Sequence, residues 1–210
     1  AVKFLPKNKT ALTGNPLRRE FLTAVPLKIE QAKSVLGFKT DVPLILVLGG
    51  SQGSVRINNF IIDNLAGLLK ISQIYHQVGD SNFNEIRQVT NSILTELGRD
   101  LSNRYNLAGF LGVRLMRQAF EAADVIISRA GAGAIFEIAA LGKPAILIPL
   151  DGSANNHQKA NAYEYSETGA AIVIEEGNFT ANILIAQINK IIGDEAVRTK
   201  MSKAALSFAN

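Results

Sequence analysis

The fold is decided by residues 123–162, which read ADVIISRAGAGAIFEIAALGKPAILIPLDGSANNHQKANA. A short apolar run at 125–127 is followed by a glycine-containing turn and by a helical pattern at 132–141. A second apolar run at 145–148 leads into a polar loop and a helix that begins near His157. This order places two polar loops directly after the carboxyl ends of two strands. Ligands bind at that edge of open parallel sheets, so the sequence predicts a binding site there.

Glu137 is an acidic residue within an otherwise apolar helical pattern. Its neighbours include Ile135, Phe136, Ile138 and Leu141, so we expect a helix that is apolar nearly all round and buried. A buried carboxylate is costly unless it is paired or hydrogen-bonded. The helix macrodipole can stabilise a glutamate in the first turn, but this residue lies deeper in the helix. We therefore favour a carboxylate that accepts hydrogen bonds from the two hydroxyls of a ribose.

Two glycine-containing turns precede helical patterns. Residues 49–54 read GGSQGS and residues 129–134 read RAGAGA, each after an apolar run. Glycine lets the backbone N–H groups of a helix start approach an anion, and two such starts could face one diphosphate. The first turn is not a G-x-G-x-x-G fingerprint, because Ser51 occupies the second glycine position, and no Gly-Lys-Ser/Thr makes it a Walker A loop. The alternative for each is a tight strand–helix turn that needs glycine flexibility.

Composition limits the class of protein. The chain has 210 residues, of which 47% are hydrophobic and 19% charged, as in a globular protein with a buried core. It has no cysteine, so neither a disulfide framework nor a thiolate metal site can form, and a reducing compartment fits. No apolar run approaches the roughly 20 residues that span a bilayer. The first residue is not Met and no signal-peptide pattern follows it, which suggests a fragment or a processed chain.

The formal net charge is +4 and is spread along the chain, without a basic tract of the nucleic-acid-binding kind. Arg18 and Arg19 form one local basic cluster, and Arg114 and Arg117 form another. We assign Arg114 and Arg117 to a solvated face, with weak attraction to anionic lipid or phosphate as the alternative.

The rest of the sequence alternates strand and helix patterns, which predicts an α/β fold with a parallel sheet and right-handed crossovers. We expect a connector at 1–40, a Rossmann-like domain with helices on both faces of its sheet at 41–193, and a C-terminal helix at 194–210. Besides the elements above, strands are expected at 43–48, 73–78, 105–110 and 170–174, and helices at 28–36, 57–69, 84–97, 113–122, 180–192 and 194–208.

Candidate catalytic and metal-binding residues are few. His76 and His157 are the only histidines and there is no Asp-x-Asp pair, which disfavours a metal-dependent transferase. We expect a structural role for His76, which lies in a strand pattern. His157, Gln158 and Asn161 open a helix, and amide side chains at such a position suit sugar hydroxyls. Ser51 has no recognisable base, so the sequence predicts no nucleophile–base triad.

A dinucleotide-binding domain is the main alternative from the residues alone. Asp80 follows the second predicted strand, roughly where a ribose-binding acid would lie in such a domain. The missing glycine in the first turn and the second polar cluster at 157–161 count against this alternative.

Five stretches, in the same order along the chain, resemble those of a known family. They are TGNPLRREF at 13–21, VLGGSQGSVRINN at 47–59, HQVG at 76–79, ADVIISRAGAGAIFEIAALGKPAILIP at 123–149 and HQKANA at 157–162. The chain resembles the C-terminal, donor-binding half of the MurG family, bacterial N-acetylglucosaminyltransferases that complete the lipid-linked disaccharide of peptidoglycan. The resemblance implies the GT-B arrangement of two Rossmann-like domains across a cleft, with residues 41–193 as the nucleotide-sugar-binding domain.

For the phosphate and base, the resemblance implies four donor-binding residues. Arg18 and Ser51 would contact the diphosphate of UDP-N-acetylglucosamine, and Asn58 would support the loop that carries Ser51. Backbone groups of Val113 would hold the uracil. Ala134 departs from the family pattern, in which threonine or serine is common, so one phosphate-side hydroxyl is lost.

For the ribose and sugar, the resemblance implies five further residues. Ala132 and Gly133 would line the nucleotide, and Glu137 would bind the ribose, in agreement with the chemical argument above. Gln158 and Asn161 would contact the sugar.

The implied activity is that of an inverting N-acetylglucosaminyltransferase, a hexosyltransferase that needs no metal or other cofactor. It would transfer N-acetylglucosamine to lipid I to form lipid II in peptidoglycan synthesis, at the cytoplasmic, inner face of the bacterial plasma membrane. We expect the lipid-linked acceptor, the catalytic base and peripheral membrane association to depend on an N-terminal half that is absent from this sequence, and we expect no catalytic residue here and no nucleic-acid partner. Two alternatives stay open, a separate donor-binding subunit of a split glycosyltransferase and a GT-B epimerase acting on UDP-N-acetylglucosamine.

Overall fold

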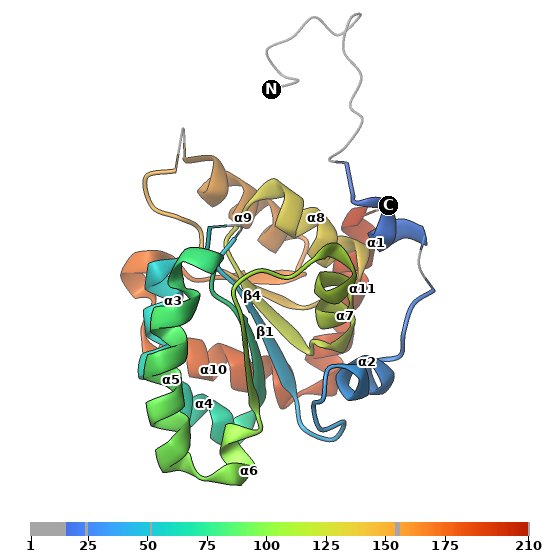
Figure 1. The fold of residues 1–210 in the computed structure, drawn as a ribbon. Helices are drawn as coiled ribbons and strands as arrows, with labels where there is room; N and C mark the ends of the chain where they lie inside the picture. Colours follow the sequence, from blue (N-terminus) through green and yellow to red (C-terminus); the bar gives the residue numbers. More distant parts are fainter. Residues whose placement is uncertain (1–15, 24, 51, 154–155, 210) are drawn as a thin grey trace, which may run out of the picture.

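Six parallel strands form one sheet in the order β3-β2-β1-β4-β5-β6. The computed structural model describes residues 16–23, 25–50, 52–153 and 156–209. Helices cover both faces of the sheet (Figure 1). This strand order is that of a Rossmann-like doubly wound fold, so the predicted fold class is confirmed.

The strands are β1 (Leu44–Leu48), β2 (Gln73–Gln77), β3 (Tyr105–Ala108), β4 (Val125–Ser128), β5 (Ala145–Leu147) and β6 (Ala171–Val173). The helices are α1 (Arg19–Thr23), α2 (Ile29–Val35), α3 (Val55–Asp63), α4 (Leu65–Ile71), α5 (Phe83–Leu97), α6 (Arg99–Ser102), α7 (Val113–Ala122), α8 (Ala132–Ala140), α9 (His157–Glu167), α10 (Ala181–Ile192) and α11 (Glu195–Ala209). Two short 3₁₀ helices are η3 (Asp80–Asn82) and η5 (Glu176–Asn178).

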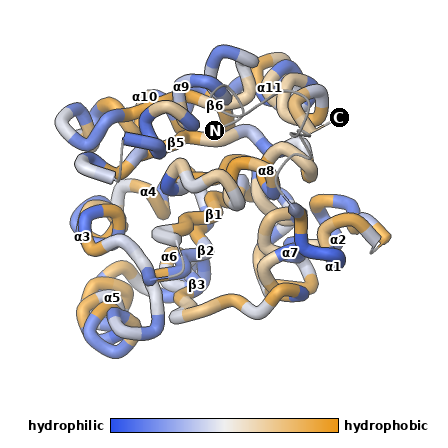
Figure 2. The backbone as a smooth tube through the Cα atoms, turned by 90° about the horizontal axis from the view of Figure 1, so that it is seen from above, coloured by the Kyte–Doolittle hydropathy of each residue, from blue (hydrophilic) through white to orange (hydrophobic). Residues whose placement is uncertain are grey.

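The sequence of β1 explains the two layers of helices. All five residues of this strand are buried, as expected for a parallel strand covered on both faces. Leu44, Leu46 and Leu48 pack with the layer that contains α1, α2, α7, α8 and α9. Ile45 and Val47 point the other way, toward α3, α4 and α10. The helices α3 and α5 carry both hydrophilic and hydrophobic residues, as helices at a protein surface do (Figure 2).

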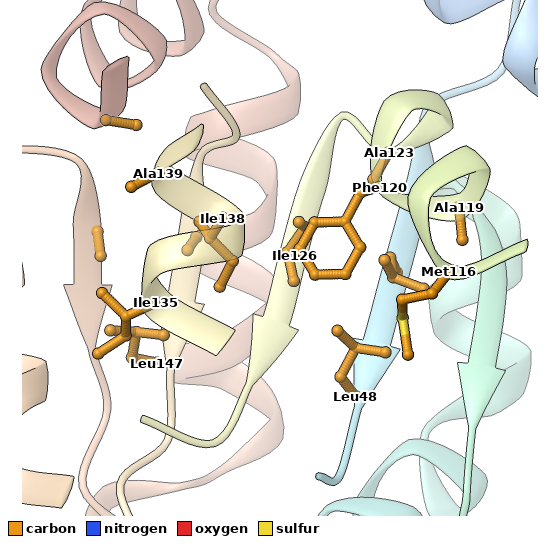
Figure 3. Packing of buried hydrophobic residues seen from close by; sticks show 14 of the residues in the cluster. Leu48, Met116, Ala119, Phe120, Ala123, Ile126, Ile135, Ile138, Ala139 and Leu147 are labelled. Atoms are coloured by element: carbon orange, nitrogen blue, oxygen red, sulfur yellow. The ribbon is translucent and has the colours of Figure 1, made fainter. Parts of the chain in front are cut away.

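The core around β4 joins α7 and α8 to the sheet. Ile138 of α8 and Phe120 of α7 lie on either side of Ile126 (Figure 3). Ile135 of α8 lies beside Leu147, and Met116 of α7 lies beside Leu48 (Figure 3). Burying each of these side chains stabilises the fold by about 1.5–3 kcal/mol. This packing fixes the helices that follow β3 and β4 against the sheet, at the edge where the predicted site lies.

One predicted helix is divided in the structure, and several short helices were not predicted. The helix predicted at 57–69 is two helices, α3 and α4, separated at Asn64. The Nδ2 of Asn64 donates to the carbonyl oxygen of Phe60 at 2.8 Å, and such side-chain bonds compete with the helical ladder. The short helices α1, α6, η3 and η5 were not predicted. The boundaries of the other predicted elements agree with the structure within a few residues.

The segment before β1 covers one face of α7. Phe21 of α1 makes an edge-to-face contact with Phe120 of α7, with ring centroids 5.5 Å apart. Arg117 of α7 is buried, bonds to Glu121 at 2.9 Å and donates to the carbonyl oxygen of Glu20. The prediction of a solvated face is therefore right for Arg114, which is exposed, and wrong for Arg117, because α1 packs over it. The predicted domain boundaries near 40 and 193 stay predictions.

Within the described ranges, none of the helices combines the length and the apolarity needed to cross a bilayer.

Candidate functional site

Two neighbouring cavities lie at the carboxyl ends of the central strands. The larger has a volume of about 660 Å³, within the usual range for ligand sites of about 300–1,000 Å³. The smaller has a volume of about 190 Å³ and shares Gly50, Ser128 and Ala134 with the larger. The strands β1 and β4 are adjacent, but the helices that follow them lie on opposite faces of the sheet. The cavities therefore lie at the topological switch point, where such sheets bind ligands.

The turn between β1 and α3 requires glycine at two positions. Gly53 has a φ of +76°, and a Cβ added to it would lie 1.9 Å from the carbonyl oxygen of Val78. A Cβ added to Gly49 would lie 2.4 Å from the backbone nitrogen of Ser54. Ser54 is the N-cap of α3, and its hydroxyl accepts from the backbone N–H of Ile57 at 3.4 Å. The close turn brings the start of α3 to the wall of the larger cavity.

A buried hydrogen-bond network of Asn58, His76 and Tyr105 supports this turn through the carbonyl oxygen of Val78. The side chain of Asn58 donates to the carbonyl oxygen of Val78 at 3.0 Å, and its own carbonyl oxygen lies 3.1 Å from Nε2 of His76. The Nδ1 of His76 lies 3.0 Å from the hydroxyl of Tyr105. A neutral imidazole satisfies both contacts if Nε2–H donates to Asn58 and Nδ1 accepts from Tyr105. The structural role predicted for His76 is confirmed, and Asn58 acts on the turn through Val78 rather than by lining either cavity.

We expect His76 alone to remove about 2 kcal/mol of folding stability between pH 7 and pH 5. Burial lowers the pKa of His76 from 6.5 to about 3. The unfolded chain therefore binds this proton first, so the stability is complete above pH 6.5 and falls as the pH drops toward 3. Urea unfolding at a series of pH values measures the effect. His76→Gln, which cannot titrate, should lose this slope, and a wild-type stability that stays flat between pH 6.5 and 5 would contradict the assignment.

The second glycine-containing turn exposes the start of α8. Gly131 is the N-cap and has no side chain to cap the first turn, and Ala132 and Gly133 are exposed. Ile135 and Ile138 are buried against the sheet. The prediction of a helix buried nearly all round is therefore wrong for the first turn, which lies beside the larger cavity that Gly131 and Ala134 line.

Glu137 has a partner within the protein. Its Oε1 lies 2.6 Å from Nε of Arg18, and the two side chains are 15% and 34% exposed. The guanidinium of Arg18 also lies over the ring of Phe21, 4.7 Å from its centroid. Both charged residues line the smaller cavity. A carboxylate can accept about four hydrogen bonds, so the ion pair leaves acceptor capacity for a ligand.

The amide side chains of α9 bond to the loop after β5 and to the turn before α8. Gln158 lines the larger cavity, and its Oε1 accepts from the backbone N–H of Leu150 at 3.1 Å. The Nδ2 of Asn161 donates to the carbonyl oxygen of Ala130 at 3.2 Å. Gln158 thus holds the loop after β5, and Asn161 holds the turn before α8.

The remaining predicted residues are placed as follows. Val113 is the first residue of α7, and Phe110 and Met116 on either side of it line the smaller cavity. Ser51 lies outside the described residues, next to Gly50, which lines both cavities. Asp80, which the dinucleotide-binding alternative requires, is exposed on η3 and lines neither cavity.

Arg129 and Glu176 line the larger cavity and were not predicted as site residues. Their side chains form an ion pair with 2.6 Å between Nη1 and Oε1. The position of Arg129 at the start of RAGAGA, directly after a strand, is a sequence signal that could have indicated it. No comparable signal marks Glu176. Across the described part of the chain, no group of three or more histidine and acidic side chains is placed to hold a metal ion.

Comparison with known proteins gives the same fold and a consistent set of relatives. The model of the glycosyltransferase family 28 C-terminal domain matches residues 44–210. The UDP-N-acetylglucosamine--N-acetylmuramyl-(pentapeptide) pyrophosphoryl-undecaprenol N-acetylglucosamine transferase of Thermodesulfovibrio yellowstonii is 34% identical over 210 residues, which cover 99% of this chain and 54% of the relative. The protein of the same name from Christiangramia forsetii is 38% identical over 176 residues, which cover 83% of this chain and 44% of the relative.

Among solved structures, MurG of Acinetobacter baumannii superposes with a TM-score of 0.69 at 24% identity, over 97% of this chain and 54% of that one. The predicted resemblance to MurG and the predicted fold, one half of a GT-B glycosyltransferase, are thereby confirmed. The chain spans about half the length of the curated relatives that it matches.

Proposed function

Because the chain belongs to the glycosyltransferase family 28 C-terminal domain family, we propose that it is the donor-binding domain of an N-acetylglucosaminyltransferase that uses UDP-N-acetylglucosamine. The names of its curated relatives contain that nucleotide sugar. One observation carries the proposal: the starts of α3 and α8 meet at one cavity, and the neighbouring cavity contains Arg18 and Glu137.

In this proposal, the diphosphate lies between the two helix starts. The N-terminus of a helix presents N–H groups and a partial positive charge to an anion. Arg18 and the segment that includes Ser51 add polar contacts on the same side. As the diphosphate leaves the sugar, its growing negative charge is stabilised by these groups, which is an electrostatic form of catalysis.

The uridine and the sugar extend in opposite directions from the diphosphate. Glu137 accepts hydrogen bonds from the ribose, and backbone groups near Val113 hold the uracil. Ala132 and Gly133 line the nucleotide. Gln158 and Asn161 lie on the sugar side, where Gln158 borders the larger cavity.

The complete enzyme would transfer N-acetylglucosamine to lipid I to form lipid II. The relatives' names contain a pyrophosphoryl-undecaprenol acceptor, and this chain corresponds to about half of each relative. We therefore assign the acceptor site and peripheral association with the inner face of the plasma membrane to the other half of the enzyme. Donor binding by this half needs no metal ion in this proposal.

Calorimetric titration with UDP-N-acetylglucosamine tests the proposal. We expect binding of UDP-N-acetylglucosamine and none of NADH, with the same result when EDTA is present. Binding of NADH without binding of the nucleotide sugar would overturn the proposal in favour of the dinucleotide alternative. Formation of an epimerised sugar nucleotide during incubation would identify an epimerase instead.

A further inference from the structure

The guanidinium group of Arg129 joins segments that follow different strands. Its Nη2 donates to the hydroxyl of Ser54 at 2.7 Å, and its Nη1 donates to the carbonyl oxygen of Ile148 at 3.1 Å. Nη1 also lies 2.6 Å from the carboxylate of Glu176. Arg129 itself follows β4, Ser54 precedes α3, Ile148 follows β5 and Glu176 begins η5. One planar side chain therefore fixes the relative positions of these segments at the rim of the larger cavity.

The bond to Ser54 acts on the start of α3. The same hydroxyl that accepts from Arg129 also accepts from the backbone N–H of Ile57, in the first turn of that helix. Gly131, the N-cap of α8, lies two residues after Arg129 in the chain. Arg129 thus links one helix start by a side-chain bond and the other through a short stretch of backbone, and so sets the spacing between them.

Glu176 balances the charge of Arg129. The two side chains are 11% and 12% exposed, so each would be costly to bury alone. The other carboxylate oxygen of Glu176 accepts from the backbone N–H of Asp151 at 3.4 Å, and its carbonyl oxygen accepts from Arg56. A buried ion pair adds little net stability but can specify one geometry. Both terminal nitrogens of Arg129 bond to protein groups, so its role is to hold the walls of the site.

We propose that Arg129 is a positioning residue for the diphosphate of the donor, acting through Ser54 to hold the starts of α3 and α8 at the spacing that one diphosphate needs. This inference rests on the proposed function. It assigns to Arg129 an effect on the phosphate part of the ligand and none on the nucleoside part, which lies toward Glu137 and α7.

Titration of Arg129→Gln with UDP and with uridine, the latter followed by NMR, tests the inference. We expect the variant to bind UDP about tenfold or more weakly, the scale of a lost hydrogen bond to a charged group, and uridine as the wild type does. Ser54→Ala should show the same selective loss. The double variant should lose no more UDP affinity than Arg129→Gln alone, because coupled residues do not act additively.

Arg129→Lys provides the matched control, because it keeps the charge and loses the planar fork. We expect lysine to restore little of the UDP affinity, and full restoration would show that charge alone suffices and overturn the inference. Equal losses of UDP and uridine affinity, or none, would also overturn it, since they indicate a purely structural role or no role. If the wild type binds neither UDP nor UDP-N-acetylglucosamine, the proposed function itself fails, and this inference fails with it.

Discussion

Replacing Glu137 with alanine is expected to weaken UDP-N-acetylglucosamine binding by about 1.5–3 kcal/mol, the scale of hydrogen bonds to a charged group. The carboxylate lines the smaller cavity and retains acceptor capacity beside its bond to Arg18. Folding stability should change little, because a partly exposed ion pair contributes about 0–1 kcal/mol. Calorimetric titration and thermal unfolding of the same preparation separate the two effects.

The ribose assignment can be isolated by changing the ligand as well as the protein. The wild type should bind UDP more tightly than 2′-deoxy-UDP, and Glu137→Ala should bind both equally. Arg18→Gln is the matched control, since it removes the ion pair and leaves the carboxylate. This variant should keep the preference for the ribose hydroxyl. A preference that survives in Glu137→Ala would remove Glu137 from the ribose site.

Much of the fold could be predicted because parallel strands buried on both faces leave a simple sequence pattern. The run LILVL in β1 is apolar throughout, and both of its faces are covered in the structure. The GGSQGS turn after it indicates a tight turn that needs glycine. In the structure, Gly53 has a positive φ and leaves no room for a Cβ beside the carbonyl oxygen of Val78. Each of these signals lies within a few consecutive residues, so it can be recognised without knowledge of the tertiary contacts.

The features that could not be predicted depend on contacts between distant segments. Arg117 is buried because α1 packs on α7, and no periodicity within α7 indicates that neighbour. The first turn of α8 is exposed beside the larger cavity, although it contains no charged or polar side chain that would indicate exposure. The break at Asn64 results from a side-chain bond that a helical pattern does not exclude.

The same limit applies to the site. The edge of the sheet, the two glycine-containing turns and Gln158 could be placed from the sequence, because the ends of parallel strands meet at one edge. The pairing of Arg18 with Glu137 joins residues 119 positions apart, and that of Arg129 with Glu176 joins η5 to the end of β4. Charge pairing at such separations is a property of the folded chain, so the sequence indicated that Glu137 needs a partner without showing that Arg18 supplies one.

Gly53→Ala is expected to destabilise the protein by roughly 2–5 kcal/mol, the sum of a left-handed backbone in a non-glycine residue and of overpacking against a fixed neighbour. The φ of Gly53 is +76°, and its added Cβ would lie 1.9 Å from the carbonyl oxygen of Val78. That oxygen accepts from Asn58 and Asn82 at 3.0 and 2.9 Å, so it cannot move away without loss of these bonds. Urea unfolding measures the loss, and UDP affinity should fall as well because the start of α3 shifts.

Gly37→Ala separates the two contributions to that loss. Gly37 has a φ of +79°, close to that of Gly53, but an added Cβ would meet nothing within 4 Å. This variant should therefore lose only the backbone contribution, about 1–2 kcal/mol, and should bind UDP as the wild type does. Equal destabilisation by the two substitutions would mean that the contact with Val78 is relieved at no cost. The turn would then be deformable, and the network of Asn58 and His76 would not hold it in place.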